Sequence, residues 1–168
     1  MEELSVGSNA PWTSGPRPVA VEAVELARRL EERAARFYRE ASRVALDEAS
    51  ARTFKELAEM EAQHEQVFAV LRGELPVGPS AEEFRRELQI LSHTLLEGLT
   101  QDLADRFDSK RDPQSILREA MEFEKDTIVF CVALKDMIVA PAGKAKIDQI
   151  IREELGHLLL LGSSLTRA

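Results

Sequence analysis

One pattern of glutamates and histidines occurs twice in this chain of 168 residues. A single Glu is followed 30 positions later by a Glu-x-x-His motif, and the whole set recurs 93 positions further along the sequence. The first set is Glu31, Glu61 and His64, and the second is Glu124, Glu154 and His157. Four carboxylates and two imidazoles arranged in this way are the ligand set of a two-metal site in a four-helix bundle. The repeat therefore predicts an all-α chain whose helices surround such a site.

The composition fits this prediction and excludes several other classes of protein. A chain of 168 residues suits one domain, and 44% hydrophobic with only 5% aromatic residues predicts a mostly aliphatic core. The net charge of −8 argues against a nucleic-acid-binding surface. No apolar run reaches the roughly 18–20 residues that span a bilayer, and the N-terminus lacks the pattern of a secretory signal. With one cysteine, and hence no internal disulfide, we expect a cytoplasmic protein.

Turn and capping residues divide the chain into an arm and four long helices. Residues 1–18 are rich in Gly, Ser and Pro and predict a flexible arm, so that residues 19–168 form the bundle domain. Pro18 and Asp47 mark the predicted starts of the first two helices, and Gly73 and Pro76 mark the end of the second. Asp112–Pro113 marks the start of the third helix, and Pro141 and Gly143 precede the fourth. The long middle section begins with a capping box at Ser80 and Glu83 and predicts a crossover with an additional helix.

Each predicted helix has an apolar stripe at helical spacing, and every ligand candidate lies inside a stripe. The stripes are Val21, Val24, Ala27, Glu31, Ala34, Tyr38 and Ala41; Phe54, Leu57, Glu61, His64, Phe68 and Leu71; Leu117, Ala120, Glu124, Thr127, Cys131 and Leu134; and Ile147, Ile150, Ile151, Glu154, His157, Leu158 and Leu161. This phase selects Glu31 over its neighbour Glu32. It likewise selects Glu124 over Glu122, which falls on a solvated face.

Four buried carboxylates would repel one another and lose their hydration, unless cations compensate their charge. Two divalent cations balance four carboxylates and two neutral imidazoles, so that the sum is zero. The Glu and His of each Glu-x-x-His motif share one helix face, which allows the Glu to bridge both metals while the His binds one. An oxygen-rich ligand set with one nitrogen per metal favours iron or manganese over a structural zinc site.

Four sequence segments resemble the rubrerythrin-like branch of the ferritin-like superfamily. They are Glu31-x-x-Ala34-x-x-Phe37-Tyr38, FKELAEMEAQHEQVF, EFEKDTIVFC and IIREELGHLLLL, and the resemblance covers about residues 19–162. It implies a ferritin-like four-helix bundle with a long crossover, and a centre of two iron ions, or manganese, on the six ligands of the repeat. It also implies an oxidoreductase that reacts Fe(II) pairs with dioxygen or hydrogen peroxide, as a ferroxidase or a peroxide scavenger, with an unknown electron donor.

The chain departs from its relatives at three points. It lacks the two Cys pairs of the rubredoxin domain that rubrerythrins have, and Thr127 stands where they have an additional Glu ligand. Ala62 occupies the position of the haem-binding Met of bacterioferritins. Two other hypotheses about the function stay open. The protein is a non-catalytic module that binds or handles iron, or it is an enzyme that oxidises an organic substrate.

Several further residues have more than one interpretation. Tyr38 lies on the same face as Glu31 and is either a hydrogen-bond partner of a ligand carboxylate or a core residue. Cys131, which is 93 positions after Tyr38, has either a redox role or a packing role. Residues 4–8 resemble the peptide that loads cargo into encapsulin shells, against the alternative of a plain tail. Apolar positions on the crossover helix suggest a homodimer or a higher homo-oligomer.

Overall fold

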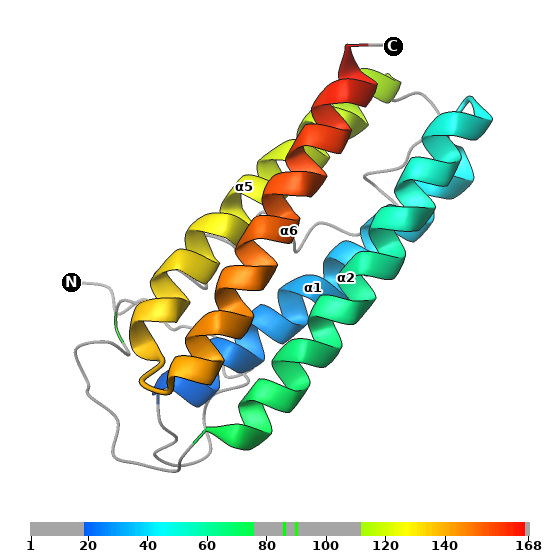
Figure 1. The fold of residues 1–168 in the computed structure, drawn as a ribbon. Coiled ribbons are helices and arrows are strands. Elements are labelled where there is room, and N and C mark those ends of the chain that lie inside the picture. The colour runs from blue at the N-terminus through cyan, green and yellow to red at the C-terminus, as the bar shows by residue number, and fades with distance from the viewer. Residues whose placement is uncertain (1–18, 76–85, 87–89, 91–111, 167–168) are drawn as a thin grey trace, which may run out of the picture.

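Four long helices make up the described part of the chain (Figure 1). The structure is a computed structural model, and it describes residues 19–75, 86, 90 and 112–166. The helices are α1 (Val19–Val44), α2 (Glu48–Glu74), α5 (Pro113–Met137) and α6 (Pro141–Leu165), and no strand occurs within the described residues. The predicted all-α four-helix bundle is therefore confirmed. None of these four helices is long and apolar enough to cross a membrane.

The connections between the helices fix how they pair. Only residues 45–47 separate α1 from α2, and only residues 138–140 separate α5 from α6, so each pair is antiparallel. Figure 1 shows the α1–α2 pair packed beside the α5–α6 pair. Arg86 and Ile90 are helical within the predicted crossover. The rest of the crossover, its use in a homo-oligomer and the predicted N-terminal arm with residues 4–8 lie outside the described residues.

The predicted capping residues start two of the helices. The Asp47 carboxylate accepts a hydrogen bond from the backbone N–H of Ser50 at 2.8 Å, which satisfies one of the free donors at the start of α2. Asp112 accepts from the backbone N–H of Gln114 at 3.3 Å, and Pro113 occupies the first turn of α5. The beginnings of α2 and α5 are therefore set by local sequence.

The prediction that Gly143 interrupts the chain before the last helix is wrong. Gly143 lies inside the first turn of α6 and is buried. A Cβ atom there would come within 2.8 Å of Ile138 Cγ2 and 3.2 Å of Leu71 Cδ1. Glycine at this position therefore allows α6 to approach Ile138 and Leu71 closely. The residue that predicted a turn in the sequence serves tight packing in the structure.

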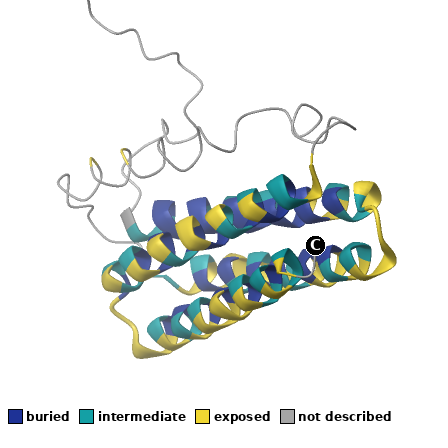
Figure 2. Cartoon of the chain, turned by 90° about the horizontal axis from the view of Figure 1, so that it is seen from above, coloured by how far each residue is buried: buried dark blue, intermediate teal, exposed yellow. Residues whose placement is uncertain are grey.

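Burial follows the predicted stripes closely (Figure 2). All predicted inward residues of α2 and α5 are buried. Val21 in α1 and Ile151 and Leu158 in α6 are only half-buried, and Ile151 still packs against an apolar cluster.

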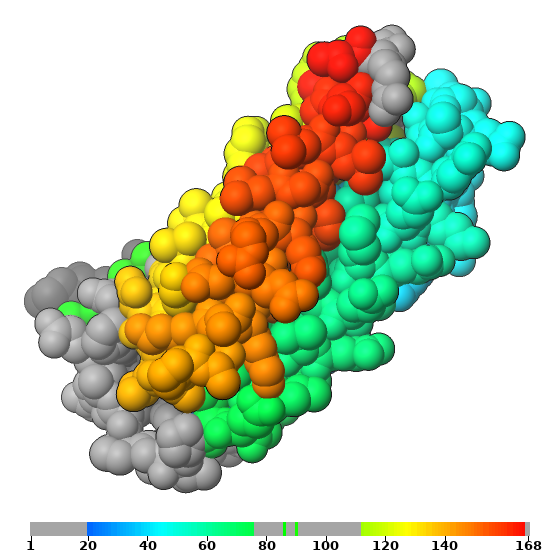
Figure 3. All heavy atoms as spheres, in the orientation of Figure 1, coloured from blue at the N-terminus to red at the C-terminus, as the bar shows by residue number. Residues whose placement is uncertain are grey.

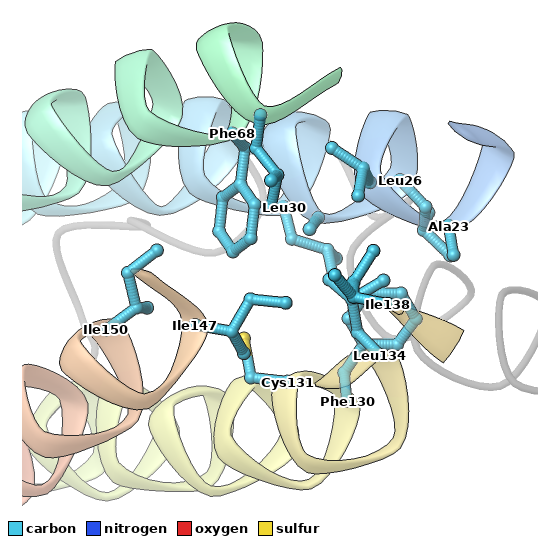
Figure 4. Packing of buried hydrophobic residues seen from close by; sticks show 13 residues of the cluster. Ala23, Leu26, Leu30, Phe68, Phe130, Cys131, Leu134, Ile138, Ile147 and Ile150 are labelled. Carbon is cyan, nitrogen blue, oxygen red and sulfur yellow. The ribbon is translucent and has the colours of Figure 1, made fainter. Parts of the chain in front are cut away.

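Two apolar clusters fill the interior, one at each end of the bundle. One contains Leu30, Phe68, Leu134 and Ile147 among others (Figure 4), and the other contains Ala34, Phe54, Leu57, Leu117 and Leu161. Along each helix, the glutamate of the repeat lies between the residues of one cluster and those of the other. The fold thus places one polar layer between two apolar clusters that exclude water from it.

Candidate metal centre

The polar layer consists of the six residues of the sequence repeat. All four glutamates are 0% exposed and both histidines are 3% exposed; the residues are Glu31, Glu61, His64, Glu124, Glu154 and His157. The acids that the phase argument rejected behave as expected, since the side chain of Glu32 is 42% exposed and that of Glu122 is 70% exposed. The predicted inward or outward direction of these acids is therefore confirmed, while their role as metal ligands stays a prediction.

The six residues form two overlapping groups of possible metal ligands. Glu31 and His64 belong to one group and Glu124 and His157 to the other, and in each group the ligand atoms lie within 4.8 Å of one another. Glu61 and Glu154 belong to both. This is the arrangement predicted from the sequence, with the Glu of each Glu-x-x-His motif shared and the single Glu completing one side.

The two shared carboxylates each present one oxygen to either imidazole. Glu154 Oε1 lies 2.9 Å from His64 Nδ1, and Glu154 Oε2 lies 2.9 Å from His157 Nδ1. Glu61 Oε2 lies 3.3 Å from His64 Nδ1, and Glu61 Oε1 lies 3.0 Å from His157 Nδ1. The imidazole rings are stacked, with centroids 5.5 Å apart. The layer thus has an approximate twofold arrangement with a bridging carboxylate on each side.

These ligand atoms fit a pair of cations better than they fit one another. Ten buried atoms of the six residues have no hydrogen-bond partner, among them both oxygens of Glu31, Glu61 and Glu154 and the Nδ1 atoms of both histidines. They approach one another closely but without hydrogen-bond geometry, as expected for atoms that face a common ion. An unsatisfied buried polar atom costs on the order of 1–3 kcal/mol, so ten in one layer indicate a missing partner. The set therefore fits two metal ions.

Burial and mutual repulsion favour the protonated form of two acids when no metal is bound. Burial first, and then the carboxylates of Glu154 and Glu61, raise the pKa of Glu31 well above its ordinary value of 4.5. Burial and the Glu61 carboxylate raise the pKa of Glu124 in the same direction. Without a metal, the layer therefore favours protons on these two single glutamates, one per group.

The imidazoles are held in their charged form by the acids around them. Although burial opposes the shift, contacts with Glu154 and Glu61 raise the pKa of His64 to about 10. The carboxylates around His157 raise its pKa to about 12, again against the effect of burial. Burial also opposes the lowered pKa of Glu154, which is due to His157 and His64. A metal ion in this layer must therefore displace protons.

Two residues outside the layer hold ligands by hydrogen bonds. The Tyr38 hydroxyl donates to Glu124 Oε1, and burial followed by the Glu124 charge raises the pKa of Tyr38 well above 10. His64 Nε2 lies 2.9 Å from Glu153 Oε2, and Gln149 Nε2 donates to Glu153 Oε1 at 3.0 Å. Sequence reasoning missed Glu153, because its phase on α6 is that of the exposed face.

Glu153 also lines a cavity of about 450 Å³ between α2 and α6. Figure 3 looks onto the face where these two helices meet. The lining residues are Gln63, Gln66, Val67, Val70, Lys146, Gln149, Ile150 and Glu153. The carboxylate of Glu153 therefore lies between this cavity and His64.

Cys131 is fully buried within the apolar cluster of Figure 4. Burial, followed by the charges of Glu154 and Glu61, raises the pKa of its thiol above the ordinary value. Because the thiolate is the reactive form, these surroundings favour an inert thiol. The position equivalent to Tyr38 in the second half of the repeat thus has no comparable donor role.

The fold and the polar layer define a helical-bundle protein with a carboxylate-rich candidate site for two metals. The sequence matches the rubrerythrin family over residues 22–163, and the chain belongs to this family. A solved structure, described as a ferritin-like diiron-carboxylate protein from Thermotoga maritima, has a TM-score of 0.70 and 22% identity to this chain. The match covers 90% of this chain and 97% of that one, and it supports the fold. No curated protein matches the chain.

Proposed function

We propose that this protein is a di-iron carboxylate oxidoreductase that reacts Fe(II) pairs with dioxygen or hydrogen peroxide. The observation that supports this most directly is the buried layer of four carboxylates and two imidazoles, in which ten side-chain oxygen and nitrogen atoms have no hydrogen-bond partner. Two divalent cations would neutralise the four carboxylates. Membership of the rubrerythrin family favours iron as the metal.

The ligand chemistry is consistent with iron or manganese. Each group offers one imidazole nitrogen and several carboxylate oxygens, whereas structural zinc sites usually have cysteine or several nitrogen ligands. The solved structure from Thermotoga maritima is described as a diiron-carboxylate protein, which supports the same choice. When bound, iron would supply both Lewis acidity and electrons for the reduction of an oxygen species.

The residues of the chain have separate roles in this proposal. Glu61 and Glu154 would take part in holding both ions, because each presents one oxygen to either imidazole. The hydroxyl of Tyr38 keeps its proton and orients Glu124 through Oε1. The apolar clusters on both sides of the layer exclude bulk water and strengthen these electrostatic interactions.

The test compares the two oxidants on the same iron-loaded protein. The chain is loaded without oxygen with two equivalents of Fe(II), and the rates of consumption of dioxygen and of hydrogen peroxide are measured separately. We expect reaction with at least one oxidant, and the faster one identifies the activity. Glu31→Gln should lower iron binding and consumption, while the exposed neighbour variant Glu32→Gln should leave both unchanged. Failure of the iron-loaded protein to react with either oxidant would overturn the oxidoreductase proposal.

A second function, a metal-binding or iron-handling module, is favoured by the same unsatisfied ligand atoms. In this case the metals mainly stabilise the bundle, because they bind the folded chain and not the unfolded one. It predicts a large fall in melting temperature after metal removal, together with negligible oxidant consumption. Turnover of either oxidant would exclude it.

A further inference from the structure

The two imidazoles of the metal layer are held differently. His64 Nε2 lies 2.9 Å from the Glu153 carboxylate, whereas His157 Nε2 is buried and has no hydrogen-bond partner among the described residues. The sequence repeat explains the difference. The residue 93 positions before Glu153 is Met60, and a thioether cannot replace a carboxylate as a hydrogen-bond acceptor for an imidazole.

The two single glutamates differ as well. Both oxygens of Glu31 are buried without hydrogen-bond partners and are therefore available to a cation. In Glu124 only Oε2 is without a hydrogen-bond partner, because Oε1 accepts the hydrogen bond from Tyr38. The repeat again accounts for this, since the residue 93 positions after Tyr38 is Cys131, which is a weak donor.

Both differences favour tighter cation binding at the same one of the two positions. A carboxylate on the outer nitrogen of an imidazole fixes the orientation of the ring and raises its basicity as a ligand. A phenol that donates to a ligand carboxylate withdraws charge from it and so weakens it as a ligand of a cation. From this geometry we infer that the two metal positions are inequivalent: the position of His64 and Glu31 binds the first divalent cation, and Glu153 is its positioning residue. This inference rests on the proposed metal centre.

Glu153 can be replaced without disturbing the core. Its side chain is 45% exposed and lines the cavity between α2 and α6. Its hydrogen-bond partners among the described residues are His64 and Gln149, and neither residue belongs to an apolar cluster. A change in metal binding on replacement would therefore report the contact with His64.

The experiment is a calorimetric titration of the full chain with Mn(II), combined with electron paramagnetic resonance at one equivalent of metal. We expect two binding steps in the natural protein, and a spectrum of mostly isolated ions at one equivalent. Glu153→Ala should weaken the tighter step by about 10- to 100-fold and leave the weaker step nearly unchanged. The two affinities then converge, and spin-coupled pairs should become more frequent at one equivalent. Glu153→Asp should restore part of the tighter step.

Two matched variants sharpen the test. Glu122→Ala removes an exposed carboxylate that is distant in phase from the layer, and it should change neither step. Met60→Glu places a carboxylate at the position equivalent to Glu153 and should strengthen the weaker step. If the natural protein binds two ions and Glu153→Ala leaves both steps unchanged, or weakens both equally, the inference is overturned. Absence of any Mn(II) and Fe(II) binding would instead overturn the proposed metal centre itself.

Discussion

Removal of the metals should make the stability of the bundle fall as the pH rises. The metal-free protein favours the protonated form of two acids, Glu31 and Glu124, because burial and neighbouring carboxylates raise their pKa values well above 4.5. It also holds protons on His64 and His157, whose pKa values the surrounding acids raise from 6.5 to about 10 and about 12 against the effect of burial. The unfolded chain therefore releases these protons at a lower pH than the folded chain does.

The sign of the effect follows from these directions. A group whose pKa is higher in the folded chain stabilises fully below its unfolded pKa, and this stabilisation is lost as the pH rises towards the folded pKa. The loss begins above 4.5 for the two acids and above 6.5 for the two imidazoles. Each proton in excess contributes a slope of about 1.4 kcal/mol per pH unit to the free energy of unfolding. The lowered pKa of Glu154 affects stability only at pH values below 4.5, so it does not offset the loss of stability at higher pH.

The assay is urea unfolding between about pH 6 and pH 9, with a chelator or with saturating Mn(II). We expect stability to fall with pH only in the metal-free protein, because bound metal has already replaced the protons. Glu31→Gln has a neutral amide in place of one titrating acid. The pH dependence of the metal-free variant should therefore be weaker than that of the natural protein. Glu32→Gln, on an exposed side chain, should keep the slope of the natural protein. A flat or rising stability of the metal-free protein would refute the reasoning.

Three further predictions concern single contacts. Tyr38→Phe leaves Glu124 Oε1 buried without its donor and should lower the free energy of unfolding of the metal-free protein by about 1–3 kcal/mol in urea; no loss would contradict the hydrogen bond. Gly143→Ala should cost about 1–3 kcal/mol by the same measurement, because the added Cβ meets Ile138; a gain in stability would show that the approach is loose. Asp47→Ala removes the cap of α2 and should lower the melting temperature without changing metal content, as measured by elemental analysis; a change in metal content would show that the cap affects the distant layer.

The sequence was sufficient to predict the helices and the membership of the polar layer. Helical starts depend on local interactions, so Asp47 and Asp112 identified them without knowledge of the rest of the chain. The phase of a residue on its own helix likewise depends only on spacing. This is why Glu31 and Glu124 could be separated from their exposed neighbours, and why the repeat predicted which glutamates are shared between the two groups.

Contacts between helices could not be predicted from the spacing of residues in the sequence. Spacing gives the face of each helix but not its rotation and height relative to the next, and these are set by packing. Glu153 looked like a surface residue because its phase is outward, yet the placement of α2 against α6 brings it to His64. Gly143 looked like a break because the sequence does not show that Ile138 approaches it. The repeat thus determined that two similar groups of ligand candidates meet in one layer, and tertiary packing decided that their surroundings differ.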